Sequence, residues 1–305
     1  MSSPFLDLRG YPIPQEQVIG CGSSAVVFLQ KGVAVKIPLR YLWSSDSDVE
    51  VNLHSVRREQ DIYRRLQSVE DERSKGIVNC VELSAESTQL AYMANGDLRA
   101  YLDKCQPSHQ LQLAWFQEIA RTLCYIHDKR VLVADIATRN FLVDTDLSVK
   151  FCDFSEASLL PLESEIETAD DNGYTTQIDV GLLGTVIYEV VTGKKCEIDL
   201  FKYNSPTDGR AYWPERKSLP STQGIWLGWI IECCWDGKFR SAHSLMQALD
   251  SVDLGFPSTV DEVYTPPYRV SIKDYMRDRP TTTIIGVLGL TMFIFMIGRR
   301  AFLMS

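Results

Sequence analysis

Three polar side chains in the middle of the chain are of the types that a phosphoryl-transfer centre uses. Asp135 precedes Asn140 by five positions, and Asp153 follows an apolar strand, a turn and a second apolar strand. Carboxylate and amide oxygens are hard ligands for Mg²⁺, and a further carboxylate can take a proton from an incoming hydroxyl. Each residue alone would also suit a turn or a strand end. Together they predict a site in which Asn140 and Asp153 hold a metal and Asp135 is the base.

A glycine-containing turn and a strand lysine are the next elements that such a centre needs. Residues 17–39 contain three short apolar runs separated by turns, which predicts three strands. Gly20 and Gly22 would let backbone amides approach an anionic ligand, although plain hairpin turns use the same pattern. Lys36 follows among apolar neighbours on the third strand, where its charge would need a partner.

The partner of Lys36 is expected on the following helix. Apolar residues recur at helical spacing over residues 51–67, and Glu59 lies on this predicted helix. Glu59 could reach back to Lys36, or it could pair with arginines one turn away on its own helix. The sequence pattern leaves both arrangements open.

The remaining pattern predicts a second, mostly helical lobe. Residues 77–83 and 88–93 look like two more strands, and residues 92–96 form the predicted hinge. Asp97 is a candidate N-cap for the helix that follows. Further helical patterns cover residues 111–129, 179–193, 224–235 and 241–252, and Gly193 stands where a helix commonly ends.

The composition describes an ordinary globular protein and excludes some classes. Hydrophobic residues make up 45% and charged residues 23% of the 305 positions. The formal net charge of −9, without clustered Lys and Arg, argues against a nucleic-acid partner. The eight cysteines show no metal-binding spacing, which favours reduced thiols in the cytosol over a disulfide framework.

The C-terminal region predicts a membrane anchor. Residues 281–298 are 18 uncharged and mostly apolar residues between pairs of arginines. As a helix they would span roughly 27 Å, slightly less than the hydrocarbon core of about 30 Å. The alternative is a buried terminal helix, but such a helix would normally show a polar face. Because only seven residues follow, the rest of the chain is expected in the cytosol.

From Val18 to about Val252 the sequence resembles the eukaryotic protein kinase fold, in particular divergent fungal kinase-like proteins, and the run DIATRN is similar to the DLAARN of tyrosine kinases. The resemblance implies an α+β, bilobal fold with a small antiparallel-sheet lobe and a larger helical lobe. It divides the chain into an N-terminal extension (1–15), a kinase-like domain (16–252, with lobes 16–93 and 94–252), a linker (253–280) and the transmembrane helix (281–298).

The same resemblance implies roles for particular residues. Asp135 would be the catalytic base, with Lys36 on the α- and β-phosphates and Glu59 as the partner of that lysine. Asn140 and Asp153 would hold Mg²⁺. Asp179 would organise the catalytic loop from a helix behind it, and Trp235 and Arg240 would lie in the last helices. The nucleotide-binding residues implied are Gly20, Gly22, Ala25, Val27, Ala34, Lys36, Tyr92 and Met93.

Several positions depart from the family pattern. Val133 and Ala134 replace the histidine and arginine that usually precede the catalytic aspartate, so we expect no activation by loop phosphorylation. Ser155 replaces a glycine after the metal-binding aspartate, and serine adopts positive φ less easily. Asp153 and Asp179 are only 26 positions apart without an APE sequence, so Arg240 is expected to lack its usual glutamate partner. The platform for a peptide substrate is therefore altered.

The sequence thus predicts an ATP- and Mg-dependent protein kinase that phosphorylates Ser/Thr or Tyr and faces the cytosol from a membrane. The mitochondrial outer membrane or the endoplasmic reticulum is favoured, because thinner bilayers accept shorter spans. The alternatives are a pseudokinase that holds a partner or a nucleotide at the membrane, and a kinase for a small molecule.

Overall fold

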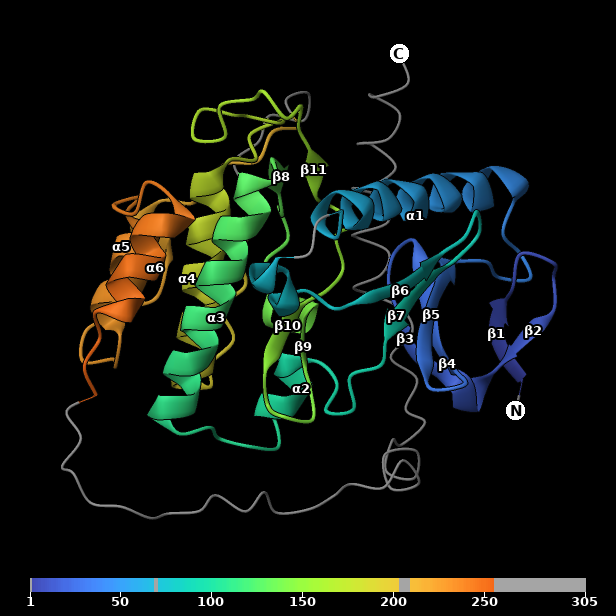
Figure 1. The fold of residues 1–305 in the computed structure, drawn as a ribbon, viewed down its shortest axis with the longest axis horizontal. Coiled ribbons are helices and arrows are strands. Elements are labelled where there is room, and N and C mark those ends of the chain that lie inside the picture. The colour runs from blue at the N-terminus through green and yellow to red at the C-terminus, as the bar shows by residue number, and fades with distance from the viewer. Residues whose placement is uncertain (1, 69–70, 203–208, 255–305) are drawn as a thin grey trace.

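The computed structural model describes residues 2–68, 71–202 and 209–254 in two lobes (Figure 1). The smaller lobe contains one five-stranded sheet with the order β3-β4-β5-β7-β6, in which all neighbours are antiparallel. Its strands are β3 (Val18–Cys21), β4 (Ala25–Gln30), β5 (Val33–Pro38), β6 (Cys80–Leu83) and β7 (Thr88–Ala91). This sheet, with the larger helical lobe beside it, is the predicted bilobal α+β arrangement.

Residues 2–14, which the sequence assigned to an extension, form a hairpin that packs on the small lobe. Strands β1 (Ser2–Leu6) and β2 (Pro12–Pro14) pair antiparallel. Ile13 is buried in an apolar cluster with Val26 and Val35 of the sheet, and the rings of Phe5 and Tyr41 are 5.4 Å apart. The hairpin therefore covers the face of the sheet that the main core leaves open.

Helix α1 (Asp46–Leu66) lies along the sheet and carries Glu59 (Figure 1). It begins earlier than its apolar pattern, because Ser45 and Asp48 form a capping box in which each side chain accepts a hydrogen bond from the other's backbone amide. Ile62, Tyr63 and Leu66 are almost fully buried. This buried stripe fixes the rotation of α1, so Glu59 points inward.

The larger lobe is built around a buried helix. Its helices are α2 (Leu98–Leu102), α3 (His109–Asp128), α4 (Thr176–Thr192), α5 (Gly228–Trp235) and α6 (Ala242–Asp250). Helix α4 is buried over most of its length and packs between α3 and α5. It ends at Gly193, whose left-handed backbone (φ 67°) confirms the predicted cap. One apolar core runs from α1 through α3 and α4 to α6.

Short strand pairs beside these helices carry the candidate site. β9 (Phe141–Val143) and β10 (Val149–Phe151) form a hairpin, and β8 (Val131–Leu132) pairs antiparallel with β11 (Ser158–Leu159). Four short 3₁₀ turns complete the described elements: Gln15–Gln17, Glu72–Gly76, Thr138–Asn140 and Arg216–Ser218. In Figure 1 the β9–β10 hairpin lies between the sheet and the helical lobe.

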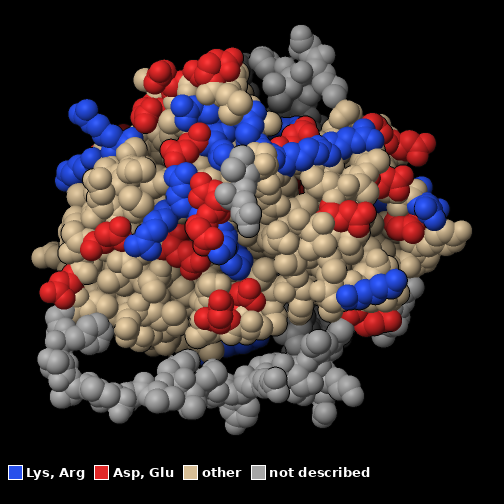
Figure 2. Space-filling view, viewed as in Figure 1, with Lys and Arg blue, Asp and Glu red and all other residues tan. Residues whose placement is uncertain are grey.

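The predicted anchor at residues 281–298 lies outside the described residues. Within the ranges that the structure describes, no helix combines the length and the apolar character that a membrane crossing requires. Figure 2 shows acidic and basic side chains interspersed on the face in view.

Candidate active site

Lys36 lies between two carboxylates that come from different parts of the chain. Its Nζ is 2.7 Å from Glu59 Oε2 on α1 and 2.9 Å from Asp153 Oδ1 after β10. Lys36 and Glu59 are almost fully buried, whereas the side chain of Asp153 is 40% exposed. Of the two arrangements that the pattern left open, Glu59 therefore pairs with Lys36 and not with arginines of its own helix.

The charges of this cluster stabilise one another. Burial on its own would lower the pKa of Lys36, but the carboxylates of Glu59 and Asp153 outweigh it and hold that pKa above its ordinary value. Loss of hydration acts to raise the pKa of Asp153, and the ammonium group reverses this and lowers it. Burial keeps the pKa of Glu59 raised although Lys36 opposes it. The lysine is thus held protonated beside an ionised Asp153.

The backbone after Asp153 is joined directly to α1. The amide of Phe154 donates to Glu59 Oε1 at 3.0 Å, and the Phe154 ring packs edge-on against Tyr63 at 5.4 Å. The left-handed residue of this loop is Asp153 itself (φ 61°), and Ser155 is not among the positive-φ residues. The substitution of glycine by serine therefore creates no strain in this conformation, contrary to the concern raised by the sequence.

Asp179 organises the loop that carries Asp135, as the resemblance implied. Its carboxylate accepts hydrogen bonds from the amides of Val133 (2.9 Å) and Ala134 (2.8 Å). The same carboxylate contacts His127 Nε2 at 2.9 Å. All four groups are buried. Ala134 adopts a left-handed backbone (φ 66°), and its methyl group places no cation beside the activation segment.

Asp135 is contacted by two neighbours from its own loop. Arg139 Nη2 lies 2.6 and 2.8 Å from the two carboxylate oxygens, and Asn140 Nδ2 donates to Asp135 Oδ2 at 2.8 Å. The contact with Arg139 did not follow from the sequence analysis. Its signal is the spacing of four positions across a short 3₁₀ turn, which brings the two side chains together. Arg139 therefore contacts both carboxylate oxygens of Asp135 while the side chain of Asp135 stays partly exposed.

The donor set fits a magnesium nucleotide. The amide nitrogen of Asn140 donates hydrogen bonds to Asp135, and Oδ1 of Asp153 accepts one from Lys36. Among the described residues, Asn140 Oδ1 and Asp153 Oδ2 accept no hydrogen bond. Two oxygen ligands from the protein, completed by phosphate oxygens, match how Mg²⁺ is bound in phosphoryl-transfer sites. Asn140 and Asp153 would hold this ion.

The predicted nucleotide-binding residues lie on strands β3–β5, on the turn between β3 and β4, and on the connection after β7. In the glycine turn, the amide of Gly22 donates to the carbonyl of Ala25 at 2.8 Å, and Gly20 pairs with Val27. Val27 in turn pairs with Lys36 on β5. The remaining predicted residues occupy β5 and the connection to the large lobe: Ala34 and Met93 are buried and Tyr92 is partly buried.

Backbone and hydroxyl hydrogen bonds, together with an arginine of α1, hold the first half of the activation segment, which runs from Asp153 to Asp179. The backbone of Ser158 pairs with Leu132 in the β8–β11 ladder, and its hydroxyl donates to Asp171. Arg65 of α1 donates to the carbonyls of Lys129 and Leu160, each at 3.2 Å. No local pattern marks Arg65, because a half-buried arginine on a charged helix resembles its solvated neighbours.

Near the end of the large lobe, Arg216 and Glu232 form an ion pair, whereas in the described part of the chain Arg240 lacks the glutamate partner that the family pattern would give it. Among the described residues Arg240 forms no ion pair and is exposed. Arg216 instead makes a two-pronged contact with Glu232 at 2.7 and 2.6 Å and lies over the ring of the buried Trp235. Thr222 also donates to Glu232 at 2.6 Å. This contact fastens the loop before α5, a loop that the sequence analysis left unassigned.

The sequence is similar to those of known protein kinases. The serine/threonine-protein kinase TIO of Arabidopsis thaliana is 25% identical over 195 residues, which are 58% of this chain and 14% of that protein. A RasGEF domain-containing serine/threonine-protein kinase of Dictyostelium discoideum is 25% identical over 234 residues (71% and 24%). The serine/threonine/tyrosine-protein kinase HT1 of Arabidopsis thaliana is 28% identical over 167 residues (47% and 40%).

The chain spans less than half the length of these three relatives. They come from a plant and a slime mould, so the likeness to fungal proteins stays a prediction. Residues 13–198, more than half of the chain, match the protein kinase domain. The chain belongs to the protein kinase family.

Proposed function

We propose that this chain transfers the γ-phosphate of ATP to a hydroxyl group of a protein substrate. The observation that carries the proposal is the contact of Lys36 with both Glu59 and Asp153 within 2.9 Å, beside a catalytic loop ordered by Asp179. The names of the relatives support Ser or Thr as the acceptor, and one of them includes Tyr.

The proposed mechanism depends mainly on positioning and charge. Lys36, held protonated by two carboxylates, presents its ammonium to the α- and β-phosphates. Bound Mg²⁺ would neutralise charge on the phosphates, and Asn140 and Asp153 would hold it. Once the substrate displaces Arg139, Asp135 orients the hydroxyl and accepts its proton.

We also propose that the active arrangement needs no phosphate on the activation segment. Ala134 supplies no cation for such a phosphate. The Phe154–Glu59 hydrogen bond and the β8–β11 pairing support the proposal, because they hold α1 and the activation segment in the chain without modification.

A transfer assay tests the activity. The full chain in detergent is incubated with radiolabelled ATP, Mg²⁺ and a library of Ser, Thr and Tyr peptides. Asp135→Asn should lower the rate at least about a hundredfold, because the base is lost. Asp144→Asn, in a nearby turn of the same lobe, is the matched control and should leave the rate unchanged. Equal background rates for wild type and Asp135→Asn would rule out catalysis by this site.

A nucleotide-binding pseudokinase is the second candidate, and one contact favours it. Arg139 covers both oxygens of Asp135, which would be a resting state in a kinase and a permanent state in a pseudokinase. In either case ATP with Mg²⁺ should raise the midpoint of thermal unfolding, and Asp153→Ala should remove the metal-dependent part. Binding without any transfer would favour the pseudokinase.

We further propose that residues 281–298 anchor the domain to a membrane, with the kinase domain in the cytosol. The proposal rests on the 18 uncharged residues flanked by arginines. A fluorescent fusion that lacks residues 281–305 should become soluble, while the full chain should colocalise with mitochondria or the endoplasmic reticulum. Continued membrane association of the truncated fusion would refute the anchor.

A further inference from the structure

Residues 209–213, here called the strap, cross the end of the activation segment. We propose that the strap replaces the missing glutamate–arginine pair and positions residues 170–174, the part of the activation segment that presents the peptide substrate. The inference rests on the proposed kinase function and adds positioning residues for its protein substrate. It follows from three sets of contacts.

The first set joins the strap to the turn at residues 170–174. Arg210 Nη2 pairs with Asp170 Oδ2 at 2.5 Å, and the amide of Ala211 donates to the carbonyl of Asn172 at 2.9 Å. Gly173 packs so closely that a Cβ there would lie 2.1 Å from the Ala211 carbonyl oxygen. An ion pair, a backbone hydrogen bond and a glycine contact therefore act on one short turn.

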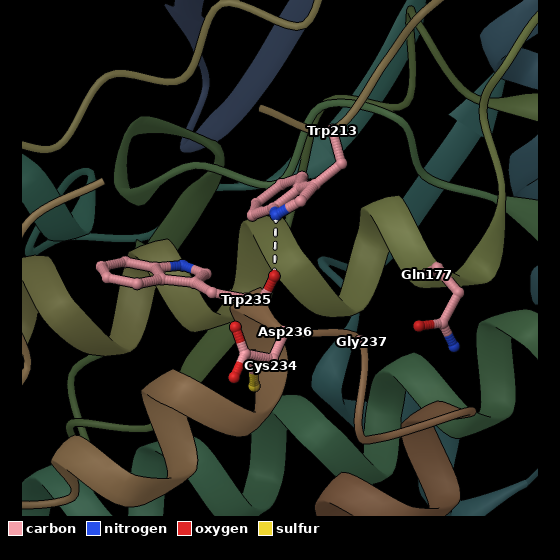
Figure 3. A pocket seen from close by; sticks show the side chains of 6 residues that line it. All are labelled: Gln177, Trp213, Cys234, Trp235, Asp236 and Gly237. Atoms are coloured by element: carbon pink, nitrogen blue, oxygen red, sulfur yellow. Dashed lines mark hydrogen bonds between the residues drawn. The ribbon is translucent and has the colours of Figure 1, made fainter. Parts of the chain in front are cut away.

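The second set anchors the strap in the large lobe. Trp213 Nε1 donates to the carbonyl of Trp235 at 3.0 Å, as Figure 3 shows. The Trp213 ring lies on α4 at Gly181, where a Cβ would lie 2.7 Å from ring atoms. The amide of Tyr212 donates to the carbonyl of Leu200 at 2.8 Å. Because α4 is buried, these contacts fix the strap to a rigid support.

The third set of contacts closes the turn and joins it to β11, which pairs with β8. Asp171 and Tyr174 exchange backbone hydrogen bonds of 3.0 Å across Asn172 and Gly173, both left-handed, which is the geometry of a tight hairpin turn. Asp171 also accepts from Ser158, and β11 pairs with β8 just before the catalytic loop. The turn is thus held by the strap through residues 170, 172 and 173 and by β11 through Asp171.

A cavity of 220 Å³ lies beside Trp213, so α4 supports the strap through only part of the Trp213 ring. This space is lined by Gln177, Trp213 and residues 234–237 at the C-terminal end of α5 (Figure 3). Trp213 therefore packs on Gly181 with one part of its ring and borders a cavity with another. Truncation of this single side chain should loosen the strap without removing a whole layer of the core.

Kinetics with the full chain in detergent test the inference. The probe is the best peptide that the wild-type chain selects from the Ser, Thr and Tyr library. Trp213→Ala should raise the KM for this peptide about tenfold and change the KM for ATP less than about twofold. Trp229→Ala, at an exposed tryptophan of α5, is the matched control and should change neither constant. An equal rise in both constants, or the same effect from Trp229→Ala, would overturn the proposal.

A surface pair keeps the test valid if Trp213→Ala does not fold. Arg210→Ala should raise the peptide KM about threefold, and Arg210→Lys should raise it less, because lysine keeps a cation beside Asp170 while Asp170 Oδ1 still accepts from the amide of Gly173 at 2.8 Å. Equal rises of the peptide KM for Arg210→Ala and Arg210→Lys, or no rise for Arg210→Ala, would contradict the role of the pair. Lys217→Ala, in an exposed pair with Glu215, should have no effect.

Hydrogen exchange separates this inference from the proposed function. Trp213→Ala should speed amide exchange at residues 171–174 and leave the interior of α4 protected. This result would support the strap even if the wild-type chain transferred no phosphate. Unchanged exchange at residues 171–174 would overturn the strap whatever the activity.

Discussion

The centre around Lys36 and the activation segment are held by different kinds of interaction. In the centre, Lys36 and Glu59 are buried charges that come from β5 and α1, and Asp153 joins them after β10. The activation segment is held in place mostly by hydrogen bonds of hydroxyl and backbone groups, such as those of Ser158. Exposed ion pairs such as Arg210–Asp170 add to them.

The two regions therefore differ in how freely their residues can be replaced. A charged side chain that is buried must keep its partner, because an unpaired buried charge costs several kcal/mol. Exposed pairs and neutral hydrogen bonds each contribute about 1 kcal/mol or less and can be exchanged for others. The comparison explains how the residues of the centre can keep the family's types while the arginine at position 134 and the APE sequence are absent.

The largest effect is expected when the buried pair is broken. Lys36→Ala leaves Glu59 buried without its cation, which should lower the free energy of unfolding by about 3–5 kcal/mol at neutral pH, measured by urea denaturation. Burial already raises the pKa of Glu59, and losing Lys36 removes the opposing charge. Because the folded pKa then lies above the unfolded value, the loss should be smaller at pH 5 than at pH 8.

Lys75→Ala is the control for this comparison. Lys75 pairs with Glu72, and both side chains are more than two-thirds exposed. The substitution should cost about 1 kcal/mol or less at either pH. Equal losses for the two lysines would remove the distinction between the centre and the surface.

An intermediate effect is expected at the Arg216–Glu232 pair before α5. Hydrogen bonds from Arg216 and then Thr222 lower the pKa of Glu232 from 4.5 to about 2. Because the folded pKa is depressed, the stabilisation is present above about pH 4.5 and is lost as the pH falls toward 2. Glu232→Gln should therefore lower the unfolding free energy by about 1 kcal/mol at pH 6, and wild type and variant should converge near pH 2.5.

The control for Glu232 is Glu215→Gln, in an exposed pair with Lys217. It should change stability by no more than a few tenths of a kcal/mol across this pH range. A difference between Glu232→Gln and wild type that grows as the pH falls would show that the pair is not the cause.

The smallest effect is expected from removing phosphate. Phosphatase treatment of the full chain, followed by removal of the phosphatase, should leave the transfer rate within about twofold, because Ala134 offers no cation to a loop phosphate. Ser164→Ala with Thr168→Ala, at exposed or half-exposed hydroxyls of the segment, should behave the same. A tenfold loss of the transfer rate that autophosphorylation restores would contradict this expectation. It would mean that a phosphate paired with a cation holds the activation segment, as paired charges hold the centre.

The parts of the fold that were predictable from the sequence carry strong local signals. Lys36 among apolar residues required a partner, and the sequence offered Glu59 as one candidate while leaving its pairing with arginines of its own helix open; the structure decided for Lys36. Asp97 caps α2 by accepting from the amide of Ala100 at 2.9 Å, and Gly193 ends α4, both as predicted. Such signals depend on a few neighbouring residues, so they can be read without knowledge of the tertiary structure.

Other parts depend on contacts between distant segments. The first three residues of α1, Asp46–Asp48, are polar, so the Ser45 capping box is what marks its start. The hairpin at residues 2–14 contains prolines and is stabilised by packing on the sheet. Trp213 carries no local pattern, and its role depends on a glycine 32 positions earlier in the chain. No periodicity or motif can report these contacts.

The contact between Gly181 and Trp213 has a consequence for how such chains can diverge. A side chain at position 181 would need the space that the indole fills, since a Cβ there would lie 2.7 Å from the ring. Neither position can change first without loss: a larger residue at 181 expels the ring, and a smaller residue at 213 leaves a cavity on α4. In descendants of this sequence the two positions should therefore covary, so that a glycine at one accompanies a large aromatic residue at the other.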